Sequence, residues 1–107
     1  MSIGYAWEKM YNAVLGMAVS PATLQERIAD AYTGNIIRLI YPGAGDDLPE
    51  DIKPMLAEIK AAMETTQPTG SEGTAVASAL AMTDAQAEDM ACKITRLFDE
   101  VQSRHRA

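Results

Sequence analysis

Residues 83–101, TDAQAEDMACKITRLFDEV, carry the most regular helical pattern in the chain. Thr83 and Gln86 have the spacing of a capping box, in which each side chain bonds to the backbone N–H of the other residue. Apolar side chains then recur every three or four residues, as one face of a helix requires: Ala87, Met90, Ala91, Ile94, Leu97, Phe98 and Val101. Basic residues 104–106 follow, where cations suit the negative end of a helix dipole. The stretch predicts a long helix that begins after Thr83.

Two further helices are predicted toward the N-terminus. Residues 4–19 repeat apolar side chains at helical spacing: Trp7, Met10, Tyr11, Val14, Met17 and Ala18. Ser20 can cap a second helix, and Pro21 suits its first position because the missing N–H would be unpaired there. This second helix is predicted over about 21–40. Gly34 lies inside it at a cost of about 1 kcal/mol relative to alanine, so it marks a place for a bend.

The middle of the chain is less regular. The composition of residues 41–47, YPGAGDD, is typical of a loop, and a third helix is predicted from about residue 49 to Thr65. Pro54 lies within its pattern, which favours a kink or a late start. Residues 74–82 are rich in alanine, which favours a short helix, but their pattern leaves open whether they are helical.

Together these segments predict one architecture. A chain of 107 residues suits a single domain, and 48% hydrophobic residues are too many for a disordered chain. No β-alternation of useful length occurs. We therefore expect residues 1–107 to form a single all-α domain, a four- to five-helix up-and-down bundle.

Composition excludes several classes of function. The net charge of −6 disfavours binding to nucleic acid, whose phosphates it would repel. No apolar stretch approaches the roughly 20 residues that span a bilayer, so no membrane partner is expected. The chain lacks a basic, apolar leader, and Cys92 as the one cysteine permits no internal disulfide, which suits a reducing cytoplasm.

Residues that could support chemistry are few. His105 is the only histidine, so we expect no zinc or di-iron site and no cofactor, and we interpret His105 as a solvated partner of the helix dipole. Cys92 has no histidine within reach to activate it and is interpreted as a small filler of the core or an interface. Asp84 and Glu88 lie four residues apart on one helix face. They are expected to be solvated acids near a helix N-terminus.

Two loop motifs have ordinary interpretations. Gly43-Ala44-Gly45 is a lone GxG that follows a helix rather than a strand, so it indicates helix termination and a turn. Asp46 or Asp47 can cap the third helix. The acidic run 46–51 does not match the calcium-loop template, which needs oxygen ligands at alternate positions and a glycine at the sixth.

The expectation for function is a non-enzymatic helical protein that acts through protein–protein contacts, as a homodimer or with another protein. The apolar faces of its predicted helices are wider than one helix–helix contact can cover, and uncovered apolar patches usually mark contact sites. The candidate interface consists of Trp7, Tyr11, Leu15, Ile36 and Ile37. The alternative is a small ligand-binding or carboxylate-based enzymatic bundle that uses Asp84 and Glu88. Burial discriminates the two, because catalytic carboxylates should line a pocket.

Overall fold

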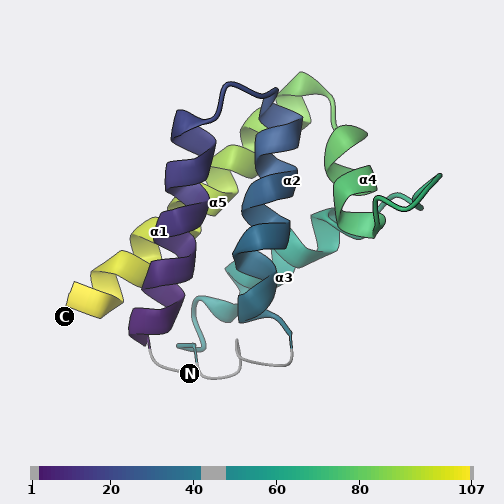
Figure 1. Cartoon of the computed structure of the whole chain (residues 1–107). Coiled ribbons are helices and arrows are strands. Elements are labelled where there is room, and N and C mark those ends of the chain that lie inside the picture. The colour runs from purple at the N-terminus through teal and green to yellow at the C-terminus, as the bar shows by residue number, and fades with distance from the viewer. Residues whose placement is uncertain (1–2, 42–47, 107) are drawn as a thin grey trace.

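A computed structural model of the chain describes residues 3–41 and 48–106 (Figure 1). Of the described residues, 73% are helical and none lies in a strand. Their elements are α1 (Ile3–Val19), α2 (Leu24–Gly34), the 3₁₀ helix η1 (Ile36–Leu39), α3 (Lys53–Ala62), α4 (Thr74–Leu80) and α5 (Asp84–Arg106). The prediction of an all-α helical bundle is confirmed.

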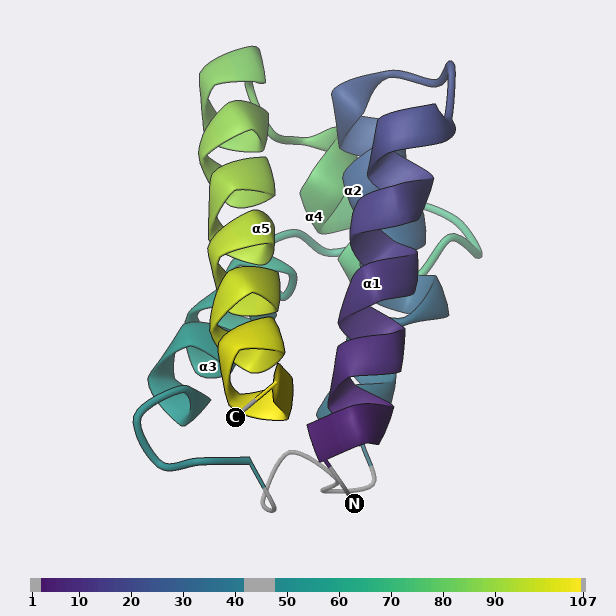
Figure 2. The ribbon, with the colours of Figure 1, turned by 90° about the vertical axis from the view of Figure 1, so that its left-hand side faces the viewer.

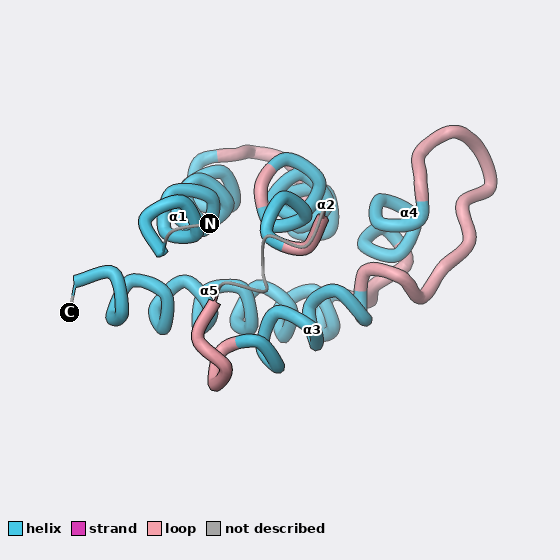
Figure 3. Tube along the Cα trace, turned by 90° about the horizontal axis from the view of Figure 1, so that it is seen from below, coloured by secondary structure: helices cyan, strands magenta, loops and turns pink. Residues whose placement is uncertain are grey.

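The helices pack in two layers. Helices α1 and α2 form an antiparallel hairpin, and the shorter α3 and α4 return the chain to the end of the molecule at which α5 begins (Figure 1). Helix α5 then runs antiparallel to α1 and beside it (Figure 2). Seen from below, α1 and α2 stand side by side while α5 and α3 form a second layer against them (Figure 3). Apolar side chains from all these elements meet between the layers.

Helix α2 begins three residues later than the sequence indicates. Thr23, rather than Ser20, is its N-cap, and the Thr23 hydroxyl accepts the backbone N–H of Glu26 at 3.2 Å. Ser20 instead accepts the N–H of Ala22 at 3.2 Å, which shapes the turn between α1 and α2. The prediction of Ser20-Pro21 as the helix start was wrong because a second capping residue lies three positions further along.

The predicted helix over 21–40 is broken near Gly34, where a bend was expected. Helix α2 ends at Gly34, and Asn35 adopts φ −137° and ψ −63°, outside the helical region. The chain then continues as η1. This change of direction turns Ile36 and Leu39 into the core, where both are fully buried.

The remaining helix ends follow their local sequence. Helix α3 starts late, with Pro54 in its first turn as expected of a residue without an N–H, and it ends at Ala62, short of the predicted Thr65. The short helix within 74–82 is present as α4. The capping box before α5 is confirmed. The Gln86 side chain accepts the backbone N–H of Thr83 at 2.9 Å, and the Thr83 hydroxyl accepts the backbone N–H of Gln86 at 3.1 Å.

Some predictions fall outside the described residues. These are the turn at Gly43-Ala44-Gly45 and the capping role of Asp46 or Asp47. Within residues 3–41 and 48–106, no helix combines the length and the apolar character needed to cross a lipid bilayer.

Candidate interaction surface

Helix α1 has an inner face and an outer apolar ridge. The inner face is formed by side chains that are buried in the core: Ala6, Met10, Ala13 and Met17. On the outer side, Tyr11, Leu15 and Val19 follow one another at intervals of four residues, which places them on the same side of a helix. Their exposed fractions are 43%, 44% and 70%. We call these three residues the outer ridge.

An aromatic cluster borders the outer ridge where α1 meets α5. Trp7 stacks on Tyr11, with 5.1 Å between ring centroids, and on His105, with 5.4 Å. The Trp7 indole N–H donates to Oε1 of Gln102 at 3.4 Å. The ring of Phe98 lies 6.3 Å from that of Tyr11. The predicted interface residue Trp7 is thus half-buried in a contact between α1 and α5, and the exposed His105 packs on it.

The structure brings together only part of the predicted interface. Tyr11 and Leu15 are exposed on one ridge, and Trp7 lies at its edge. Ile36 is fully buried, so its assignment to an interface is corrected: the break at Asn35 turns it into the core. Ile37 is half-buried and packs against the core.

Two residues of this surface were missed from the sequence. Val19 continues the spacing of Tyr11 and Leu15 by four more residues, and this spacing was the available signal. Gly16 is exposed in the middle of α1, and a Cβ added there would meet nothing within 4 Å. A glycine in a helix costs about 1 kcal/mol relative to alanine. No contact within the described residues accounts for that cost.

The outer ridge lies in a segment without charge. Residues 10–25 include no Asp, Glu, Lys or Arg, although the whole chain has a net charge of −6. The repulsion between two copies therefore comes from other parts of the molecule.

The alternative site at Asp84 and Glu88 lacks the expected pocket geometry. Both residues are exposed, and Asp84 accepts a hydrogen bond from the Gln25 amide at 2.9 Å. The carboxylate that lines the pocket of about 650 Å³ beside α3, α4 and α5 belongs to Asp89, and neither Asp84 nor Glu88 lines it. The predicted carboxylate pair therefore does not converge on this pocket.

Polar groups of that pocket already have partners within the protein. The Lys93 ammonium lies 2.9 Å from the Asp89 carboxylate and 3.0 Å from that of Glu58, and hydrogen bonds to these two groups raise the pKa of Lys93. The buried Ser78 hydroxyl accepts backbone N–H groups from the segment after α3. The pocket is lined by groups that hold α3, α4 and α5 together.

The interpretation of Cys92 as a filler of the core is wrong. Its side chain is exposed on α5, because it lies one position beyond Ala91, away from the inner face of the helix. In residues 3–41 and 48–106, no group of three or more His, Cys, Asp or Glu side chains could hold a metal ion.

Comparison with known proteins assigns the chain to no family. No protein-family model matches it, and neither a curated protein nor a solved structure shows significant similarity.

Proposed function

We propose that this protein is a non-enzymatic helical module that acts by protein–protein contact, and that its contact is self-association through the outer ridge of α1. The observation that carries this proposal is the exposure of Tyr11, Leu15 and Val19 on one side of α1, within a stretch, residues 10–25, that has no charged residue. Exposed apolar patches that are continuous in this way usually mark contact sites. We also propose the cytoplasm as its location, since the exposed Cys92 thiol would stay reduced there.

Charge favours a second copy of the chain as the occupant. Two copies that each carry −6 repel one another through most of their surfaces. Contact through residues 10–25 brings no like charges directly together. Closed two-fold dimers also use the same patch on both subunits, so a single ridge suffices for both sides of the interface.

The backbone of α1 supports close helix packing. Gly16 lies next to Leu15 on the exposed side of the helix, with open space where a side chain would be. A second helix could approach closely there. Helix α1 also has no acidic residue in its first turn and no basic residue in its last turn. A two-fold dimer with antiparallel α1 helices would bring the positive end of each helix dipole toward the negative end of the other.

The expected dimer is weak and reversible. The exposed parts of the three ridge side chains amount to about one and a half apolar side chains per copy, on the order of 3 kcal/mol if fully covered. Two copies together gain on the order of 6 kcal/mol, and the loss of translational and rotational freedom offsets several kcal/mol of this. Because about 4 kcal/mol corresponds to a dissociation constant of about 1 mM, the dimer is expected to form only as the protein concentration approaches the millimolar range.

Sedimentation equilibrium from micromolar to millimolar protein concentrations tests the proposal. The mass should rise from that of one chain toward that of two as concentration increases. Leu15→Glu should return the mass to one chain. Leu80→Glu is the matched control, because Leu80 is 52% exposed on α4 and lies away from the ridge. The proposal is wrong if the wild-type mass stays at one chain, or if both variants change the mass equally.

A second variant checks the face assigned to Tyr11. Tyr11→Asp should shift the mass toward one chain while the circular dichroism spectrum stays helical. Because Tyr11 also stacks on Trp7, some loss of stability is expected. Complete unfolding of Tyr11→Asp would mean that this residue serves the core instead.

A further inference from the structure

A second pocket, of about 330 Å³, lies where α2 and η1 meet the end of α3 and the start of α4. Its size is at the lower end of the range for small-molecule sites. The apolar part of its lining comes from α2, η1, α4 and the residues just after η1 and α3: Tyr32, Ile37, Ala75, Tyr41 and Met63. The pocket is formed by residues other than those of the outer ridge, so it is independent of the proposed dimer.

Tyr32 places an unpaired hydroxyl at this pocket. The residue is only 2% exposed, yet its hydroxyl has no hydrogen-bond partner among the described residues. Buried tyrosine hydroxyls usually find a partner. In the part of the chain that the structure describes, Nε of Arg27 is the one side-chain polar atom that is both fully enclosed and without a partner. The unpaired Tyr32 hydroxyl is therefore not fully enclosed.

Burial and the charges around Tyr32 keep its phenol protonated. Burial, and next the negative charge of Glu64, raise the pKa of Tyr32 to about 12, and Tyr41 contributes in the same direction. Tyr32, Glu64 and Tyr41 all line the pocket. At neutral pH the phenol is protonated and can donate a hydrogen bond.

The carboxylates of the pocket are already partnered. Glu64 pairs with Lys60 at 3.0 Å, and Glu72 accepts the backbone N–H of Thr69 at 3.1 Å. Hydrogen bonds from its own N–H and that of Thr69 lower the pKa of Glu72, so it stays charged. Glu64 and Glu72 line the pocket, and the positive charge beside them is that of Lys60, which already pairs with Glu64, so an anionic ligand is disfavoured.

We propose that this pocket binds a small, neutral and mainly apolar molecule that carries a carbonyl-type acceptor, which takes the hydrogen bond of the Tyr32 hydroxyl. The apolar part of the ligand packs against Ile37, Met63 and Ala75. Neutrality follows from the partnered carboxylates, and the acceptor follows from the unpaired donor on a buried residue.

A titration of ¹⁵N-labelled protein with three probes of similar shape tests the ligand class. Acetophenone is neutral and carries an acceptor, benzoate is anionic, and benzylammonium is cationic. Acetophenone should shift the amide signals of residues around Tyr32 and Ala75 in a saturable way, and benzoate should not. Tighter binding of benzylammonium or benzoate than of acetophenone would overturn the assignment, as would the absence of saturable shifts with acetophenone.

Matched variants test the role of the hydroxyl. Tyr32→Phe should weaken acetophenone binding about fivefold or more, as expected for the loss of one hydrogen bond, without loss of fold. Tyr11→Phe is the control, because it removes a tyrosine hydroxyl from the outer ridge and Tyr11 does not line this pocket. Ala75→Leu should abolish the shifts by filling the pocket. An unchanged affinity in Tyr32→Phe, or an equal loss in Tyr11→Phe, would refute the proposed donor.

Discussion

Replacing Ser78 with alanine should weaken the attachment of α4 to the segment that follows α3. Ser78 is 1% exposed, and its hydroxyl oxygen accepts the backbone N–H of Thr65 at 3.0 Å and that of Thr66 at 3.1 Å. These two residues follow the end of α3, where the chain turns away from the helix. Ser78→Ala removes the acceptor for both donors while leaving the backbone of α4 unchanged.

The magnitude follows from the number of donors left without a partner. Each unsatisfied buried donor costs about 1–3 kcal/mol. Thr65, Thr66 and Ser78 line the pocket of about 650 Å³, so water can reach the donors and the lower end of that range applies. Alanine recovers about 0.5 kcal/mol because it is the better helix former. We expect a net loss of about 1.5 kcal/mol in the free energy of unfolding, or about 8 °C in melting temperature.

Urea and thermal unfolding, followed by far-ultraviolet circular dichroism, measure this loss. Amide exchange adds a local measurement, since the N–H groups of Thr65 and Thr66 should exchange faster in Ser78→Ala. Ser103→Ala is the control, because Ser103 is exposed on α5 and should change stability little. A loss below about 0.5 kcal/mol for Ser78→Ala would show that its hydroxyl does not hold α4 to the chain after α3.

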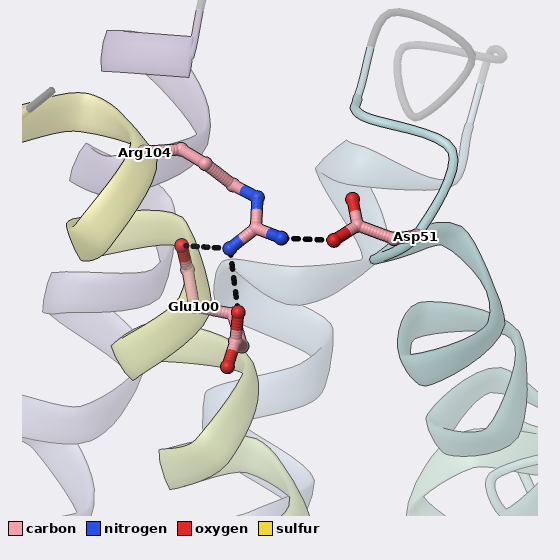
Figure 4. A network of polar contacts seen from close by, with 3 residues as sticks. All are labelled: Asp51, Glu100 and Arg104. Carbon is pink, nitrogen blue, oxygen red and sulfur yellow. Dashed lines mark hydrogen bonds and ion pairs between the residues drawn. The ribbon is translucent and has the colours of Figure 1, made fainter.

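Three further perturbations have definite expected outcomes. Thr83→Ala removes one half of the capping box of α5 and should cost about 1 kcal/mol in urea unfolding, and an unchanged midpoint would contradict the role of the box. Arg104 bridges Asp51 and Glu100 at the surface (Figure 4), so Arg104→Gln should lower stability at low salt, and the difference should shrink in concentrated salt. A salt-independent difference would indicate lost packing instead. Backbone N–H groups lower the pKa of Glu72. The stability that its charged carboxylate contributes to the fold is therefore fully present above the ordinary carboxyl pKa, and it is lost as the pH falls through the lowered pKa. In Glu72→Gln this acid-dependent loss should disappear from the pH profile of unfolding, and an identical profile would refute the interaction.

The sequence alone identified the helices because local physical rules determine them. Apolar spacing located α1 and α5 to within a residue of their observed starts, and the Thr83–Gln86 pair predicted the hydrogen bonds that cap α5. Pro54 correctly indicated a late start for α3. These features depend on residues within a few positions of one another, so they can be read from a single sequence.

The faces of the helices were less accurately predicted. The stripe assigned to α1 was centred near Tyr11, whereas the buried positions include Ala6 and Ala13. Small alanines contribute little to an apolar pattern, yet they are favoured where another helix packs closely. The exposure of Tyr11 and Leu15, which the proposed contact needs, depends on this rotation of the helix.

The sequence therefore determined the all-α class, the helices and the charge-free stretch that contains the outer ridge. Only the tertiary structure decided that Ile36 is core, that Cys92 is exposed, and that neither Asp84 nor Glu88 lines the pocket beside α3, α4 and α5. It also brought together the lining of the Tyr32 pocket from residues far apart in the chain. Adjacent residues on a helix point about 100° apart. The apolar pattern of one helix therefore does not determine which other helix covers each of its sides. Which face is buried depends on the helices that pack against it, and their positions come from contacts between distant segments.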